Sequence, residues 1–230
     1  QAGFYESLRC RLAALVEASV VSQGLSDSGM IILEAMLRLR QAAILPALLS
    51  PEYARIPSAK LELLMDLLAD IGSEGKKALV FSQFTAVLDA VETRLGRARI
   101  PWYRLDGSTP HAERAARIAA FQSHCCSTCF LISLKAGGLG INLTEADYVI
   151  LLDPWWNPAV EAQAIDRAHR FGRRSPVIAY RIIARGTIEE KLLRLQARKR
   201  RLAESLISSE GGGASLRSLT AEELEELFAP

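Results

Sequence analysis

The sequence predicts a doubly wound α/β fold, in which helices cover both faces of a parallel β-sheet. From residue 76 onward, short apolar runs alternate with helical stretches, and this alternation is typical of parallel strands joined by helices. Several runs, such as residues 149–152, are apolar throughout, as expected for strands buried on both faces. Half of the 230 residues are apolar, which is enough for the core of one such domain with appendages.

The first part of the chain, residues 1–57, is predicted to be a helical preface to that domain. Apolar residues spaced three and four apart run through residues 4–21 and again through about residues 30–49, which indicates two amphipathic helices. Residues 22–29 between them are rich in turn-forming types. Prolines then break the pattern, and Ser58 can cap a helix that runs to Gly72.

The α/β domain itself is predicted to occupy residues 58–186. The expected strands cover residues 78–81, 102–105, 130–133, 148–152 and 177–183, and the expected helices cover residues 84–95, 110–121 and 158–169. Ligands of doubly wound sheets bind at the carboxyl ends of the strands. The segments that follow these strands are therefore where a functional site is expected.

The C-terminal part is predicted to hold two further helices. Residues 187–190 read as a capping box, which opens a basic helix over residues 187–208. Residues 209–230 are expected to form a glycine-rich linker and a short acidic helix that begins with a second capping box at residues 220–223. This last helix could dock on a partner or on the body of the domain.

Charge and cysteine content limit the classes of function only weakly. The 28 basic and 26 acidic residues leave a net charge of +2, so bulk charge does not identify a nucleic-acid-binding protein. Cys125, Cys126 and Cys129 lie beside His124 and nominally offer metal ligands, but a second ligand pair at zinc-finger spacing is missing. We therefore expect reduced thiols and no metal site.

Neither a membrane span nor a leader is expected. No apolar run approaches the roughly 18 residues that a membrane helix needs, and the N-terminus lacks a charged segment followed by an apolar one. The first residue is Gln1 and not methionine, so we expect the chain to be part of a longer protein.

The most informative stretch is the predicted helix that contains Gln163, Arg167 and Arg170. Spacings of four and three place these side chains on one helical face. Two fixed guanidinium groups suit a polyanion whose charge rises during reaction, as in phosphoryl transfer. The alternative is a solvated arginine face without a ligand.

A glycine-rich segment follows the predicted strand at residues 130–133. It contains Ser133, Lys135, Gly138, Gly140 and Asn142, and its glycines would let backbone amides approach phosphate oxygens closely. The glycines could instead only make a tight exit from the strand. The spacing departs from the dinucleotide-binding pattern, because Leu143 stands where the third glycine would be.

Two adjacent tryptophans, Trp155 and Trp156, follow the next predicted strand. Exposed at that edge they could stack on bases, although tryptophan in such a turn more often packs, and we expect at least one to pack. The sequence contains no P-loop and no Asp-Glu dipeptide. The residues that bind ATP and magnesium in P-loop ATPases are therefore missing from this chain.

Taken in order, these segments resemble the C-terminal-lobe motifs of SWI/SNF-type ATPases in helicase superfamily 2. Five ordered motifs carry the resemblance, which extends from about residue 34 onward, and residues 186–191 are similar to the start of the brace helix that follows them. The motifs are residues 77–84, residues 105–110 with Arg114 and Phe121, the glycine-rich segment, the turn at residues 153–158 and the helix with Gln163, Arg167 and Arg170.

The resemblance implies a RecA-like lobe that closes on a partner N-terminal lobe across ATP, with double-stranded DNA lying across both. The Mg²⁺ ligands would belong to that other lobe. Arg167 and Arg170 would reach the nucleotide phosphates, with Arg170 as the arginine finger. The remaining implied site residues are Gln163, Gly138 and Gly140 for ATP, and Ser82, Gln83, Ser133, Lys135 and Asn142 for the DNA backbone or for a relay between DNA and nucleotide.

The chain departs from the family pattern at Arg173, which stands where a glutamine is common, so the hydrogen bonding there is open. The tail resembles bacterial members, which would place the protein in the cytoplasm at the nucleoid; a eukaryotic protein would be nuclear. A DNA-bound protein to be displaced is a further possible partner.

Two alternative functions stay open: a strand-separating helicase, and a non-catalytic α/β module that binds nucleic acid or protein through the basic helix.

Overall fold

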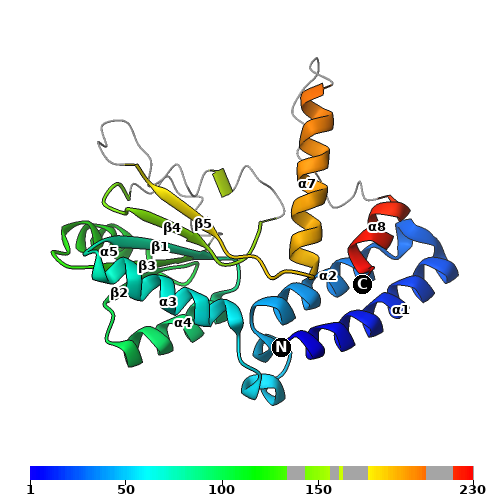
Figure 1. Cartoon of the computed structure of the whole chain (residues 1–230), viewed down its shortest axis with the longest axis horizontal. Coiled ribbons are helices and arrows are strands. Elements are labelled where there is room, and N and C mark those ends of the chain that lie inside the picture. The colour runs from blue at the N-terminus through cyan, green and yellow to red at the C-terminus, as the bar shows by residue number, and fades with distance from the viewer. Residues whose placement is uncertain (134–142, 156–160, 163–175, 206–219, 230) are drawn as a thin grey trace. The chain divides into compact units, whose positions relative to one another are not determined.

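The computed structural model describes residues 1–133, 143–155, 161–162, 176–205 and 220–229, with the backbone alone for residues 200–205. The chain divides into two compact units (Figure 1). One unit is formed by Ala59–Ile182, and the other by Gln1–Ser58 together with Ile183–Pro230. None of the described helices is both long enough and apolar enough to cross a membrane.

The unit of residues 59–182 contains a five-stranded parallel sheet, which confirms the predicted fold class. Its strands pair in the order β2-β3-β1-β4-β5, and every described pairing is parallel. Residues of β3 and β4 are all buried, as expected for apolar strands between two layers of helices. The strands are β1 (Lys77–Ser82), β2 (Trp102–Leu105), β3 (Thr128–Ser133), β4 (Tyr148–Leu151) and β5 (Ile178–Arg181).

Helices cover both faces of this sheet. The helices α3 (Ala59–Ser73) and α4 (Thr85–Ala98) lie side by side and contact β1 (Figure 1). The helix α5 (His111–Ser123) brings Phe121 into the core cluster with Leu79 and Phe81, where it stacks on Phe130 with 5.2 Å between ring centroids. Side chains alternate along a strand, so the buried Ala78 and Val80, which are not in that cluster, face the layer of α3 and α4.

The other unit is helical. The helix α1 (Ala2–Asp27) contacts α2 (Gly29–Ile44), and two short 3₁₀ helices, η1 (Pro46–Leu48) and η2 (Pro51–Arg55), follow. The helix α7 (Ile188–Ser205) contacts α2. Tyr5 links α1 to the start of α7, because its hydroxyl accepts a 2.7 Å hydrogen bond from the Ile188 amide. Burial raises the pKa of Tyr5 to about 12.

Two boundaries in this unit differ from the prediction. A turn-rich stretch was expected to separate the two helices at residues 22–29, but α1 continues to Asp27 and is only kinked at Gly24, whose φ of 81° is not helical. The serines close this kink, because the Ser28 hydroxyl accepts a hydrogen bond from Ser19 and donates one to the Gly24 carbonyl. The second helix ends at Ile44 and not near residue 49, since Pro46 begins a 3₁₀ turn.

The last helix, α8 (Ala221–Phe228), docks on α1 and α7 of its own unit. Its predicted capping box is confirmed, because the Thr220 hydroxyl accepts from the Glu223 amide and the Glu223 carboxylate accepts from the Thr220 amide. Leu224, Leu227 and Phe228 are buried. The box expected at residues 187–190 is formed differently: Thr187 accepts from the Glu189 amide, and the carboxylate of Glu190 accepts from Gly186.

Candidate functional site

The carboxyl ends of β1, β3 and β4 meet at one edge of the sheet. Ser82 ends β1 and lies in register with Ser133, which ends β3, and both residues are buried. The Ser82 hydroxyl donates a 2.6 Å hydrogen bond to the carboxylate of Asp153, which follows β4 and is 1% exposed. The Gln83 amide donates to the same carboxylate at 3.2 Å. Asp153 therefore ties the end of β1 to the segment that leaves β4.

The side chain of Gln83 adds an unusual group at this edge. Its amide nitrogen Nε2 is buried and finds no hydrogen-bond partner within the part of the chain that the structure describes. A buried donor without a partner costs on the order of 1–3 kcal/mol, so such groups are rare and often functional. The Nε2 group of Gln83 is thus a hydrogen-bond donor at this edge that the described residues do not satisfy.

The segment after Asp153 is anchored a second time. The Trp155 amide donates a 2.6 Å hydrogen bond to Oε1 of Glu161, and Arg181 of β5 forms an ion pair with the other carboxylate oxygen. Glu161 is 3% exposed. The indole of Trp155 packs against the core cluster that contains Phe121, so the expectation that at least one tryptophan packs is confirmed.

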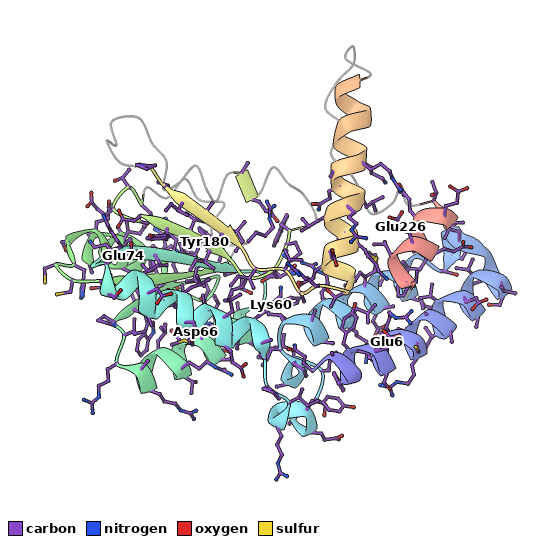
Figure 2. The ribbon with its side chains drawn as sticks, viewed as in Figure 1. Glu6, Lys60, Asp66, Glu74, Tyr180 and Glu226 are labelled. Carbon is purple, nitrogen blue, oxygen red and sulfur yellow. The ribbon has the colours of Figure 1, made fainter. Side chains whose placement is uncertain are left out.

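Lys60 of α3 joins the ends of two strands. It is 4% exposed, and its ammonium group donates to the carbonyls of Leu152 at 2.8 Å and Ile182 at 2.9 Å (Figure 2). Leu152 directly follows β4 and Ile182 directly follows β5. A buried ammonium group needs such acceptors, and here they fix α3 against this edge of the sheet.

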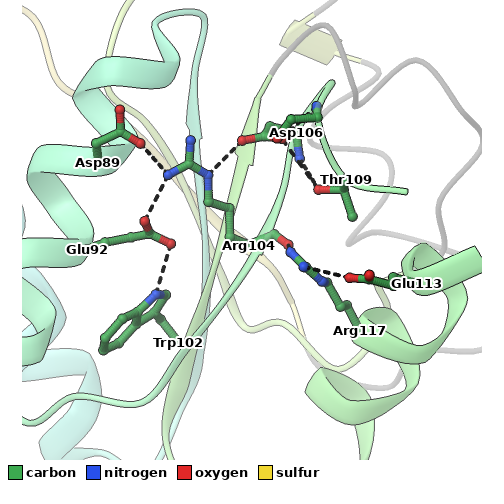
Figure 3. Close-up of polar contacts among 9 residues, drawn as sticks. Asp89, Glu92, Trp102, Arg104, Asp106, Thr109, Glu113 and Arg117 are labelled. Carbon is green, nitrogen blue, oxygen red and sulfur yellow. Dashed lines mark hydrogen bonds and ion pairs between the residues drawn. The ribbon is translucent and has the colours of Figure 1, made fainter. Parts of the chain in front are cut away.

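The turn after β2 is organised by a network of charged groups (Figure 3). Arg104 forms ion pairs with Asp89 at 2.5 Å, Glu92 at 2.8 Å and Asp106 at 2.7 Å. Asp106 is buried, and its carboxylate also accepts from the amide and the hydroxyl of Ser108. Burial alone would raise the pKa of Asp106, but the hydrogen bonds from Ser108 and Arg104 outweigh it and lower the pKa.

The chain is similar to known helicase-type proteins in both sequence and structure. Residues 59–172 match the family described as helicase conserved C-terminal domain. The solved SWI2/SNF2 ATPase C-terminal domain of Sulfolobus solfataricus is 30% identical, has a TM-score of 0.75 and is covered by this chain over 92% of its length. The chain belongs to the SWI2/SNF2 ATPase family. It is a helicase-type C-terminal domain of that family, as the sequence resemblance predicted.

Other relatives of this SWI2/SNF2 domain are much longer than the chain. DNA repair protein RAD5 of Cryptococcus neoformans is 43% identical over 176 residues, which are 75% of this chain and 14% of that protein. ATP-dependent helicase rhp16 of Schizosaccharomyces pombe is 39% identical over 174 residues, and 20% of it is covered. The Sulfolobus solfataricus SWI2/SNF2 ATPase core solved in complex with dsDNA has a TM-score of 0.78 and is covered over 47%. The bacterial origin expected from the tail stays a prediction.

The structure of this SWI2/SNF2 domain describes some of the predicted site residues and not others. Ser82, Gln83 and Ser133 are described, and they meet at the strand edge together with Asp153. The other predicted residues lie outside the described ranges. These are the loop residues Lys135, Gly138, Gly140 and Asn142 and the helix residues Gln163, Arg167 and Arg170.

Ser82 makes its hydrogen bonds within the domain. Its hydroxyl is buried and occupied, since it donates to Asp153 and accepts from the Phe84 amide at 3.1 Å. Of the two roles that the resemblance implied, a relay to neighbouring groups fits this position better than direct contact with a backbone phosphate.

The cysteines of the domain have separate environments. Cys129 is buried in β3 and burial raises its pKa to about 12, whereas Cys125 and Cys126 are exposed. His124 lies 3.1 Å from the Tyr103 hydroxyl. In the described ranges no three histidine, cysteine or acidic side chains come together as metal ligands.

Sequence reasoning missed four polar residues that the structure brings to this region: Lys60, Arg104, Glu161 and Arg181. Lys60 and Glu161 are buried, Arg104 is half-buried and the side chain of Arg181 is 41% exposed. Each contacts a residue distant in the sequence, and Arg104 also contacts the nearby Asp106. For Glu161 a signal was present, because it is an acidic residue two positions before Gln163 in a stretch that is otherwise small and apolar. Its partners could not be read from the sequence.

Proposed function

We propose that this domain is the second motor lobe of an ATP-dependent double-stranded DNA translocase. In this proposal it supplies Arg167 and Arg170 to ATP that a first lobe holds together with Mg²⁺. The observation that carries the proposal is the strand edge of a SWI2/SNF2 domain: Asp153 is bound to the end of β1, and Glu161, two positions before Gln163, is bound to Trp155. An arginine that stabilises a transferring phosphoryl group needs such fixed support.

The chemistry assigned to these residues is electrostatic. Negative charge spreads over the oxygens of the transferring phosphoryl group, and fixed guanidinium groups stabilise it. Arg170 takes the role of the arginine finger, Arg167 contacts the phosphates, and Gln163 aligns them. Gly138 and Gly140 would let the backbone approach the nucleotide closely.

Binding of DNA is assigned to the same edge of the lobe. Gln83, Ser133, Lys135 and Asn142 would contact the sugar-phosphate backbone, while Ser82 would act through Asp153 as a relay. Contacts to the backbone carry little sequence information, so binding should tolerate any sequence and weaken as salt increases. The relative solved with dsDNA supports this assignment.

The partners of the lobe follow from the proposal. The N-terminal lobe of the same polypeptide would hold the triphosphate, and a protein bound to DNA would be what the motor displaces. Localisation at the bacterial nucleoid, or in the nucleus of a eukaryote, stays a prediction. Movement along duplex DNA without obligatory strand separation is what the family resemblance favours, and an unwinding assay distinguishes it from a helicase.

The proposal is tested by Arg170→Ala in the protein that carries both lobes. We expect ATP turnover to fall by about 10³-fold or more, with duplex binding largely retained, because the lost group acts on the transition state. Arg97→Ala is the matched control, since Arg97 is an exposed arginine at the end of α4. Near-normal turnover of Arg170→Ala would remove this residue from the finger role.

The rival hypothesis is a non-catalytic module that binds nucleic acid through the basic helix α7. One observation weakens it, because described basic residues of this helix are paired within their own unit. Arg194 pairs with Glu190, Arg198 with Glu226 of α8 and Lys199 with Glu223 of α8. If the protein with both lobes hydrolyses no ATP on duplex DNA, this rival is the better reading.

A further inference from the structure

We propose that Glu161 is a positioning residue, which holds the start of the arginine-bearing segment against the sheet so that Arg167 and Arg170 reach the nucleotide in one orientation. The inference rests on the proposed function and adds to it a residue that does not itself touch ATP or DNA. It is carried by the contacts of Glu161 with Trp155 and with Arg181.

Both carboxylate oxygens of Glu161 are committed to these two partners. Oε1 accepts the 2.6 Å hydrogen bond from the Trp155 amide, and Oε2 pairs with the guanidinium group of Arg181. The side chain of Glu161 is 4% exposed, whereas that of Arg181 is 41% exposed. The carboxylate of Glu161 is therefore buried, and it is paired with a more exposed guanidinium group from β5, at the edge of the described sheet.

Both partners are held by contacts with the sheet unit. The Trp155 indole packs on the hydrophobic core, and Arg181 lies in β5 in register with Leu151 of β4. Glu161 and Ala162 are helical, and Gln163 follows immediately. A carboxylate fixed from two directions at this point restrains both the position and the rotation of the chain before the first predicted ligand-binding residue.

The energetics favour a positioning role over a stabilising one. Burying a carboxylate is costly, and its ion pair and hydrogen bonds at best offset the loss of hydration. Replacing both members of such an ion pair by apolar residues of similar size often leaves stability unchanged, whereas removing Glu161 alone would leave the Trp155 amide without its acceptor. What an acid provides here, and an apolar residue does not, is a directional link to one backbone amide and one guanidinium group.

The size of the expected effect follows from the geometry of catalysis. A displacement of about 1 Å in a group that stabilises the transition state can cost on the order of 100-fold in rate. In the protein with both lobes, we expect Glu161→Ala to lower kcat and kcat/KM together by roughly 10- to 100-fold. Glu161→Gln should lose less, because the amide oxygen can still accept from Trp155.

A matched control is available in the same unit. Glu113 also pairs with an arginine, Arg117, at 2.8 Å, but its side chain is 53% exposed. Glu113→Ala should leave kcat within about twofold of the parent, since exposed ion pairs contribute little. Duplex affinity should stay within twofold in every one of these variants, because Glu161 is not proposed to contact DNA.

A mutant cycle against the two arginines separates positioning from a general structural role. If Glu161 acts by placing Arg167 and Arg170, Glu161→Ala should have little further effect on single-turnover rates once both arginines are replaced by alanine. Multiplication of the defects in that combined variant would overturn the inference, and so would normal turnover of Glu161→Ala. Normal turnover of Arg170→Ala would instead overturn the proposed function, so the two failures are distinguishable.

Discussion

At the scale of single residues, Asp106 organises a turn through contacts on several sides. Its carboxylate accepts from Arg104 and twice from Ser108, and its own amide donates to the Thr109 hydroxyl at 3.1 Å (Figure 3). The lowered pKa of Asp106 means that its charged form is favoured in the folded protein. Such a group stabilises the fold above its unfolded pKa of about 4, and this contribution is lost as the pH falls through the lower folded value.

We therefore predict that Asp106→Asn destabilises the domain at pH 7 and flattens its acid response. The expected loss in the free energy of unfolding is about 1–3 kcal/mol, measured by urea denaturation at pH 7 and again between pH 5 and pH 3. Asp89→Asn is the control, because Asp89 pairs with the same Arg104 but is 62% exposed. Equal effects of the two variants would contradict the role given to burial.

Site residues could be predicted from the sequence where they belong to a motif. Residues whose hydrogen-bond partners are distant in the sequence could not be predicted. Ser82, Gln83 and Ser133 were expected at strand ends, and they are there. The bond from Ser82 to Asp153 spans 71 positions and depends on β1 lying beside β4, which no local pattern encodes. Lys60 and Glu161 escaped notice for the same reason, since their partners come from other strands.

At the scale of elements, α8 shows how a short helix is stabilised by its neighbours. Eight residues are too few for a stable isolated helix, so its order depends on the burial of Leu224, Leu227 and Phe228 against its own unit. The carbonyl of Phe228 also accepts a hydrogen bond from Arg9, and that of Ala229 accepts one from Lys191. The ion pair of Glu226 with Arg198 of α7 adds little, because the two side chains are 43% and 51% exposed.

Leu227→Ala should accordingly detach or destabilise this helix. Leu227 is 1% exposed, and the loss of a buried leucine side chain costs about 2–5 kcal/mol. The measurement is the free energy of unfolding, together with the rate at which protease cuts within residues 221–229. Glu225→Ala, an exposed change in the same helix, should alter the free energy by less than about 0.5 kcal/mol. Unchanged protection of α8 in Leu227→Ala would refute the docking account.

Apolar periodicity predicted where most elements lie in the sequence, but not which elements lie beside one another in the fold. The described strands fall where short apolar runs were found, because buried parallel strands have few other possible compositions. The order β2-β3-β1-β4-β5 was not predicted, since it depends on crossovers and not on local sequence. The break expected over residues 22–29 is shorter than predicted, because α1 is kinked at Gly24 and continues to Asp27, and hydrogen bonds of Ser19 and Ser28 close the kink.

At the scale of the whole molecule, the first and last segments form one helical unit, although the sequence analysis treated them as separate preface and brace. The hydrogen bond from Ile188 to Tyr5 joins residues 183 positions apart, which no sequence period could reveal. The family, in contrast, was predicted correctly, because its motifs are local and ordered. ATP hydrolysis is also a property of the whole protein in the proposed mechanism, because one nucleotide site is divided between two lobes.

The most direct test of that division is the steady-state ATP turnover of the isolated chain with saturating duplex DNA, compared with the protein that carries both lobes. In the proposed function Arg167 and Arg170 act on the transition state, whereas the sequence contains no P-loop to seat the triphosphate. We predict turnover at background level for the chain alone and DNA-stimulated turnover for the protein with both lobes. Robust DNA-stimulated hydrolysis by the isolated chain would contradict the claim that it is one half of a shared site.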